Sequence, residues 1–256
     1  MGSSVAVRGS GYKYKVSVDA KERLIVALDF DSSQRAFDLV EKLEGLVSFF
    51  KVGIELQLAE GMSPAKYLLE KGKKVFLDLK YYDVPETVSR AVQHAASLRV
   101  NFLTIHGNGP NVRAAIEGRR NAGATDLKLL SVTVLTSLDA EDIREMGYPV
   151  SVEELVLQRV DQALKAGCDG VIASGQEAKR IKEATGDKLL IITPGIRPER
   201  VPAQDQKRAV QPKEAVMAGA DYLVVGRPIT NPTSGDERGA AQSILREMQD
   251  AWDSMN

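Results

Sequence analysis

The feature of this sequence that most constrains its fold is an eightfold alternation between short apolar runs and segments with helical spacing. Apolar runs of about four to eight residues are typical of parallel strands that are buried on both faces. We predict strands at residues 24–29, 48–53, 74–80, 102–106, 128–135, 170–174, 189–193 and 222–225. We predict helices at residues 36–43, 64–71, 85–98, 110–122, from 139, and at 152–166, 176–184, 212–218 and 239–252.

A strict repeat of strand and helix indicates a parallel sheet with right-handed crossovers. Eight such units in 256 residues predict a single-domain α/β protein, a closed (β/α)₈ TIM barrel over residues 21–256. The alternative is an open doubly wound sheet. That fold often carries Gly-x-Gly-x-x-Gly after its first strand, where this chain has Leu-Asp-Phe-Asp at residues 28–31.

Charge and composition narrow the partners of the chain. The 34 basic and 35 acidic residues leave a formal net charge of −1, so no overall basic field attracts nucleic acid or an anionic membrane. One cysteine and two histidines exclude an internal disulfide and argue against a His/Cys zinc site, and we expect no metal. Residues 1–20 have no apolar core of a secretory signal and are expected to be a poorly ordered leader on a cytoplasmic protein.

Charged residues lie inside or against the apolar runs, where an unpaired charge is costly. Asp29, Lys51, Asp78 and Lys80 fall near the carboxyl ends of the first three predicted strands, and barrel enzymes build their active sites there. Asp78 and Lys80 are two residues apart and should face the same way. We therefore expect an inward cluster of alternating lysines and aspartates, with Asp83 just beyond it. A purely stabilising role is disfavoured, because buried ion pairs often add little net stability.

A second group of residues has the character of an anion site. Gly226 and Arg227 follow the eighth predicted strand, and Arg197 follows the seventh. Barrel phosphate sites are commonly formed by the loops after these two strands, and arginine binds phosphate through charge-assisted hydrogen bonds. Gln206, in the long polar loop at residues 197–211, could add an amide donor.

The longest motif is Asp-Leu-Lys-Tyr-Tyr-Asp-Val-Pro-Glu-Thr at residues 78–87, and it resembles the signature of the orotidine 5′-phosphate decarboxylases of bacterial type. Further segments resemble motifs of this family in the same order, at residues 28–30, 50–53, 133–137, 193–198, 205–208 and 225–230. The chain departs from the family at Ala203-Gln204, where Gly-Asp is frequent, and at Tyr82, where histidine is frequent.

The resemblance implies decarboxylation of orotidine 5′-monophosphate to uridine 5′-monophosphate, the last step of de novo pyrimidine nucleotide synthesis, without a cofactor. It implies a homodimer whose two subunits share their active sites. The implied catalytic residues are Lys80, as proton donor to C6 of the pyrimidine, with Asp78 beside the substrate carboxylate, Lys51, and Asp83.

The resemblance also implies the substrate contacts. Asp29 and Lys51 would bind the ribose, Thr136 would contact the pyrimidine, and Asp83 and Thr87 would reach into the neighbouring subunit's site. The phosphate would be held by Arg197, Gln206, Gly226 and Arg227. The remaining implied substrate-binding residues are those of the signature segment, namely Asp78, Leu79, Lys80, Tyr81, Tyr82, Val84, Pro85 and Glu86.

Two other functions remain open from the sequence. A magnesium-dependent sugar-phosphate decarboxylase or isomerase of the same suprafamily would share the Asp-x-Lys-x-x-Asp core, and its activity would be sensitive to EDTA. A catalytically silent nucleotide-binding protein would keep the pocket, but every expected catalytic residue is present, which argues against it.

Overall fold

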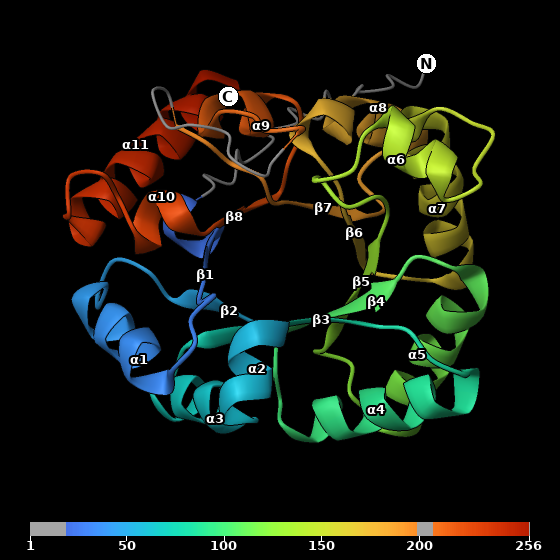
Figure 1. Ribbon diagram of the computed structural model, residues 1–256, viewed down its shortest axis with the longest axis horizontal. Helices are drawn as coiled ribbons and strands as arrows, with labels where there is room; N and C mark the ends of the chain where they lie inside the picture. Colours follow the sequence, from blue (N-terminus) through green and yellow to red (C-terminus); the bar gives the residue numbers. More distant parts are fainter. Residues whose placement is uncertain (1–18, 199–206, 256) are drawn as a thin grey trace, which may run out of the picture.

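The computed structural model describes residues 19–198 and 207–255 of the chain. Its eight strands form a closed parallel barrel in chain order, with the helices outside it (Figure 1). The strands are β1 (Leu24–Ala27), β2 (Phe49–Gly53), β3 (Lys74–Tyr81), β4 (Phe102–His106), β5 (Lys128–Val132), β6 (Gly170–Ile172), β7 (Leu190–Thr193) and β8 (Tyr222–Val225). The barrel is closed by parallel pairing of β8 with β1, so the predicted single-domain barrel is confirmed and the open sheet is wrong.

The helices cover the outer surface of the barrel. A 3₁₀ turn at Ala20–Glu22 precedes β1. The α-helices are α1 (Ser33–Lys42), α2 (Ile54–Glu60), α3 (Ser63–Glu70), α4 (Pro85–Ser97), α5 (Gly109–Asn121), α6 (Ala140–Glu145), α7 (Val152–Ala166), α8 (Gly175–Thr185), α9 (Pro212–Met217), α10 (Arg227–Thr230) and α11 (Glu237–Met255). In the described residues, no helix is both long enough and apolar enough to cross a membrane.

Local sequence signals set the ends of several helices. Ser151 and Glu154 form a reciprocal capping box at the start of α7, and Gly167 ends that helix with a left-handed φ of 82°. Asp139, the N-cap of α6, accepts hydrogen bonds from the backbone N–H groups of residues 141 and 142. These caps satisfy N–H groups that have no partner within the helix.

The structure differs from the prediction at the rim of the barrel. β1 ends at Ala27 and β5 at Val132, so Asp29 and Thr136 lie in the connections that follow. Both apolar runs continue past the last paired residue, so composition alone overestimates the strand length. The helix α2 was not predicted, since it follows β2 without a turn and exposes Leu58. Of the expected leader, residues 1–18 lie outside the described residues.

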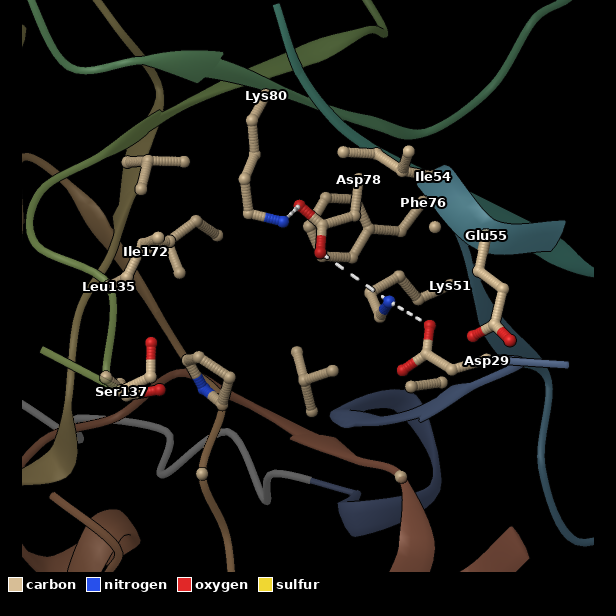
Figure 2. Close-up of a pocket in the computed structure, with 18 of the residues that line it drawn as sticks. Asp29, Lys51, Ile54, Glu55, Phe76, Asp78, Lys80, Leu135, Ser137 and Ile172 are labelled. Atoms are coloured by element: carbon tan, nitrogen blue, oxygen red, sulfur yellow. Dashed lines mark hydrogen bonds and ion pairs between the residues drawn. The ribbon is translucent and has the colours of Figure 1, made fainter. Parts of the chain in front are cut away.

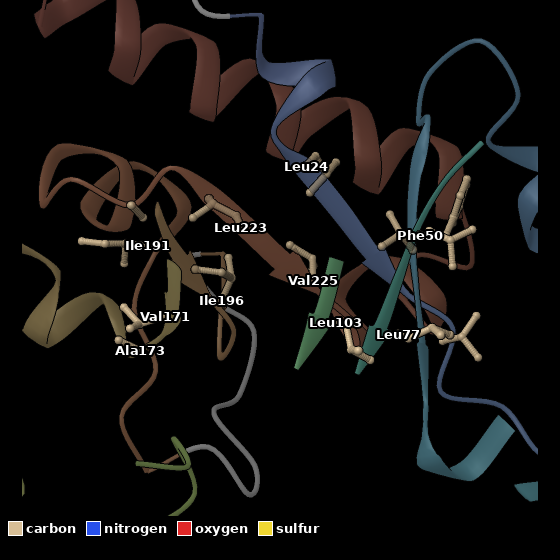
Figure 3. Packing of buried hydrophobic residues seen from close by; sticks show 14 of the residues in the cluster. Leu24, Phe50, Leu77, Leu103, Val171, Ala173, Ile191, Ile196, Leu223 and Val225 are labelled. Atoms are coloured by element: carbon tan, nitrogen blue, oxygen red, sulfur yellow. The ribbon is translucent and has the colours of Figure 1, made fainter. Parts of the chain in front are cut away.

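Side chains alternate between the inside of the barrel and the surrounding helices. Phe50, Leu77 and Leu103 belong to the large cluster of buried residues that includes the covering helices (Figure 3). The barrel interior forms a second cluster, in which Phe49 and Tyr222 pack edge-on against Phe102 with ring centroids 4.9 Å and 5.1 Å away. This aromatic packing fills the interior, so polar side chains lie at the two ends of the barrel.

Three strands are fixed at the amino end of the barrel by the same contact. The residues directly before β4, β6 and β8 are Asn101, Asp169 and Asp221. Each side chain accepts a hydrogen bond from the backbone N–H of the second residue in the preceding strand, at 2.8, 2.9 and 2.8 Å. The repeat pairs the strands β3–β4, β5–β6 and β7–β8 at an end of the barrel that is remote from the polar rim.

We expect Asp221→Ala to lower the free energy of unfolding by about 1–3 kcal/mol, because it leaves the N–H of Ile191 without its acceptor. Asp187→Ala is the matched control. Asp221 also pairs with Lys182, at 3.1 Å. Asp187 contacts the same Lys182 at 3.2 Å, but its side chain is 97% exposed, so its removal should have almost no effect. Urea denaturation of both variants measures the two losses of stability. Equal losses would contradict the proposed role of Asp221 in fixing the start of β7.

Candidate functional site

A cavity of about 560 Å³ opens at the carboxyl ends of the strands. Its polar lining contains eight of the residues expected from the sequence, which are Asp29, Lys51, Asp78, Lys80, Thr136, Arg197, Gly226 and Arg227. The order of these residues in the chain is also their order around the barrel rim. The cavity therefore has a carboxylate and lysine side at β1–β3 and an arginine side after β7 and β8.

The charged side of the cavity is a continuous chain of ion pairs (Figure 2). Lys51 Nζ lies 2.7 Å from Asp29 Oδ1 and 3.6 Å from Asp78 Oδ2. Lys80 Nζ lies 2.9 Å from Asp78 Oδ1. Acidic and basic groups thus alternate in the order Asp29, Lys51, Asp78 and Lys80. The cluster of these four residues that the sequence predicted is therefore present, and Asp83 is not among its members.

Burial and charge act against each other on the central pair. Burial alone would raise the pKa of Asp78, but the ammonium groups of Lys51 and Lys80 outweigh it, and the pKa lies below its usual value. Burial alone would lower the pKa of Lys51, but Asp78 and Asp29 outweigh it, and that pKa is raised. Both groups are therefore held in their charged forms at neutral pH.

Lys80 reaches Asp78 from an irregular strand. The pairing of β3 with β4 shifts register between Leu77 and Tyr81, and Lys80 has a left-handed φ of 48°. Such a backbone is uncommon outside glycine and needs support from its surroundings. The sequence predicted the contact between Lys80 and Asp78 from the alternation of side chains along a regular strand. Because the strand is irregular here, regular alternation does not explain the contact.

Thr104 supports this irregular segment and was not predicted from the sequence. Its hydroxyl accepts a hydrogen bond from the Lys80 backbone N–H at 2.9 Å and donates one to Asp78 Oδ1 at 3.0 Å. Thr104 is fully buried on β4, next to β3. The only signal in the sequence is a hydroxyl residue inside an apolar strand.

Gly53 is a second residue whose role was not predicted, although it lies in the family-like segment at residues 50–53. A Cβ atom at this position would lie 2.9 Å from Asp29 Oδ1 and 2.9 Å from Lys51 Nζ. The absent side chain therefore leaves the room that this ion pair occupies. Glu55 also lines the cavity (Figure 2).

On the other side of the cavity, Arg197 is only 8% exposed and donates a hydrogen bond from Nη1 to the carbonyl of Ile196 at 2.9 Å. A Cβ atom at Gly226 would make only ordinary van der Waals contacts, with Ala27 Cβ at 3.8 Å and Asp29 Oδ2 at 4.0 Å. Arg227 is the first residue of α10. Gln206, the fourth residue expected at a phosphate, lies outside the described residues.

The rest of the signature segment does not line the cavity of this one chain. Leu79 and Tyr81 pack against the hydrophobic core, and residues 82–87 are exposed. The carboxylate of Asp83 accepts a hydrogen bond from the neighbouring backbone N–H of Val84 at 2.7 Å. The Tyr82 ring lies against His106, with ring centroids 4.6 Å apart. Among the described residues, no group of three or more His, Cys, Asp or Glu side chains is arranged to hold a metal ion.

A closed eight-stranded barrel with a charged cavity at the carboxyl ends of its strands has the architecture of a TIM-barrel enzyme. The model of the orotidine 5′-phosphate decarboxylase / HUMPS family matches residues 22–244. The chain is 53% identical to the orotidine 5′-phosphate decarboxylase of Nitrobacter winogradskyi, over 91% of this chain and 95% of that relative. It is 44% identical to the enzyme of the same name from Rhodopseudomonas palustris, over 90% of this chain and 96% of that relative.

The crystal structure of orotidine 5′-phosphate decarboxylase from Lactobacillus acidophilus superposes with a TM-score of 0.77 at 36% identity. The superposition covers 88% of this chain and 98% of that one. This chain belongs to the orotidine 5′-phosphate decarboxylase / HUMPS family.

We expect Gly53→Ala to lower turnover at least about tenfold with little effect on folding, because displacing the Asp29–Lys51 pair misplaces functional atoms. Gly109→Ala is a suitable control, since its Cβ would meet only the movable end of the Arg113 side chain, at 3.1 Å. Steady-state kinetics and thermal melting of both variants test this expectation. Wild-type turnover in Gly53→Ala would show that the ion pair tolerates displacement.

Proposed function

We propose that this protein decarboxylates orotidine 5′-phosphate to uridine 5′-phosphate, the last step of de novo pyrimidine nucleotide synthesis. The bond between C6 and the carboxylate breaks and CO₂ leaves. The electron pair of the broken bond remains on C6. The Lys80 ammonium then gives a proton to C6, and the resulting amine takes a proton from water. The single observation that carries this proposal is the placement of Lys80 Nζ on the cavity, 2.9 Å from Asp78 in a chain of fixed charges.

Electrostatic stabilisation is the proposed source of the rate. The carbanion at C6 is poorly delocalised by the ring, so a fixed positive charge beside it lowers the barrier. A fixed ammonium in a site with little water acts more strongly than one in bulk solvent, and it needs no reorganisation during the reaction. Lys80 would supply both the charge and the proton. Asp78, ionised beside the departing carboxylate, would hold Lys80 in place and oppose the negative charge of the substrate.

The order of side chains around the rim supports one orientation of the nucleotide. Arg197 and Arg227 would hold the phosphate, while Asp29 and Lys51 would contact the ribose hydroxyls. C6 would then lie beside Lys80, and the pyrimidine would reach towards Thr136. The phosphate is remote from the bond that breaks, so its binding energy can be used to position the reacting atoms.

We also propose a homodimer with shared active sites. Asp83 and Thr87 are exposed and do not line the cavity of their own chain, so they are available to a neighbouring subunit. Large apolar side chains are exposed in the segments that directly follow the neighbouring strands β2 and β3, namely Ile54, Leu58, Tyr82 and Val84. An exposed apolar surface of this kind is typical of a protein–protein interface.

The cytoplasm is the proposed location, because a charged nucleotide does not cross a lipid bilayer unaided and the enzyme must meet its substrate. Cell fractionation tests it, and recovery of the protein with membranes or outside the cell would contradict it.

We expect Lys80→Ala to abolish turnover of orotidine 5′-phosphate while leaving binding of uridine 5′-phosphate measurable. General acid–base groups contribute about 10²–10⁴-fold to rate, and Lys80 would also supply the stabilising charge. A stopped or continuous assay measures turnover of orotidine 5′-phosphate, and calorimetry measures binding of uridine 5′-phosphate. A variant that retained more than about a tenth of the wild-type rate would refute the role of Lys80.

The shared site is tested by co-expressing two defective variants. If Asp83 acts in the neighbouring subunit, Lys80→Ala with Asp83→Ala should give mixed dimers that each contain one intact site. Statistical pairing in a two-fold dimer then restores about a quarter of wild-type activity. Lys51→Ala with Lys80→Ala is the control, because Lys51 and Lys80 lie in the cavity of one chain and each site keeps a defect. Equal activity in both mixtures would contradict the sharing.

A further inference from the structure

Arg208 is a buried charge outside the cavity. The Arg208 residue is 7% exposed, and so is Glu177 on α8, with which its Nη1 forms an ion pair. Neither side chain lines the cavity. A buried guanidinium is costly unless it is paired and hydrogen-bonded, so its presence calls for a structural or functional reason.

The guanidinium of Arg208 binds the backbone that forms one wall of the cavity. Its Nη2 donates hydrogen bonds to the carbonyls of Val134 and Leu135, both at 2.9 Å. Its backbone N–H donates to the carbonyl of Thr136 at 3.3 Å. All three of these carbonyl residues line the cavity, and they follow β5 without regular secondary structure. Arg208 therefore replaces the hydrogen bonds that a strand or helix would provide.

The position of Arg208 is fixed from two further segments. The Ser174 hydroxyl, which is fully buried at the start of α8, donates to the Arg208 carbonyl at 2.9 Å. Two residues along the chain, Val210 pairs with Ile196 in an isolated parallel bridge beside Arg197. Arg208 thus joins the connection after β5 to the segments after β6 and β7.

Glu177 orients the guanidinium. Burial raises the pKa of the Glu177 carboxyl, although the charge of Arg208 opposes this. Lysine could not replace the arginine, because its single ammonium nitrogen cannot present separate donors in a plane to a carboxylate and two carbonyls.

We propose that Arg208, held by Glu177, is a positioning residue that sets the base-side wall of the cavity at residues 134–136. The inference rests on the proposed function in one respect, namely that the pyrimidine lies against this wall. Arg208 acts through these backbone groups and touches no substrate. Its loss should therefore weaken recognition of the base and leave recognition of the ribose and phosphate largely intact.

The test compares two ligands by calorimetry, uridine 5′-phosphate and ribose 5-phosphate, which lacks the base. For Arg208→Lys we expect affinity for uridine 5′-phosphate to fall about tenfold or more, with ribose 5-phosphate changed by less than about twofold. Equal losses for both ligands, or no loss for either, would overturn the proposal.

Arg119→Lys is the matched control. Arg119 also pairs with a carboxylate, that of Asp169, and donates to a backbone carbonyl, that of Leu127 at 3.1 Å, but at the amino end of the barrel. Arg119→Lys should change thermal stability but not the affinity for uridine 5′-phosphate or for ribose 5-phosphate. A selective loss of affinity for uridine 5′-phosphate in this variant would overturn the proposal.

Glu177→Gln gives a second and milder variant, because the amide keeps an acceptor for Arg208. It should show the same selectivity with a smaller loss of uridine 5′-phosphate affinity. If Arg208→Lys does not fold, the result with Glu177→Gln decides the question, and unchanged affinities overturn the proposal. A wild-type protein that binds uridine 5′-phosphate but does not decarboxylate orotidine 5′-phosphate would refute the proposed function and leave this inference standing.

Discussion

Asp78 lies between the ammonium groups of Lys51 and Lys80, and this arrangement of charge is the constraint on which the rest of the site depends. Each lysine keeps the carboxylate ionised, and the carboxylate keeps both lysines in place. A chain of alternating charges holds little net charge, so it can remain partly buried at the mouth of the barrel. The same chain would stabilise the fold only weakly, since desolvation of charges offsets much of their attraction.

The barrel provides what such a chain of charges needs. The aromatic cluster of Phe49, Phe102 and Tyr222 fills the interior, and the charged residues of the cavity lie beyond it at the carboxyl end. Neighbouring strands then bring Asp29, Lys51 and Asp78 side by side, although they are far apart in the sequence. The opposite end of the barrel is fixed by separate contacts, such as that of Asp221 with β7. Stability and chemistry are therefore assigned to different ends of the molecule.

The sequence predicted the barrel because its strands are short apolar runs and its helices have clear caps. It also predicted that Asp29, Lys51, Asp78 and Lys80 would cluster, since charges in apolar runs must be paired. Strand ends at Ala27 and Val132 could not be predicted, because the apolar composition continues beyond the last paired residue.

Other features depend on contacts between distant segments. Thr104 supports Asp78 from the next strand, and Gly53 acts through a side chain that it lacks. Arg208 meets Glu177 and the residue 134–136 backbone only after three separate connections have come together. Single-sequence patterns record local spacing, so they do not show which distant residues meet, even where a hydroxyl residue inside an apolar strand marks Thr104 as unusual.

The most direct test of the account is to add orotidine 5′-phosphate to the purified protein in the presence of EDTA and follow ultraviolet absorbance. We expect the pyrimidine absorbance to change at the same catalytic rate with and without the chelator, with CO₂ and uridine 5′-phosphate as the products. Binding of the nucleotide without any conversion, or conversion that EDTA abolishes, would contradict the claim that fixed protein charges alone carry out the decarboxylation.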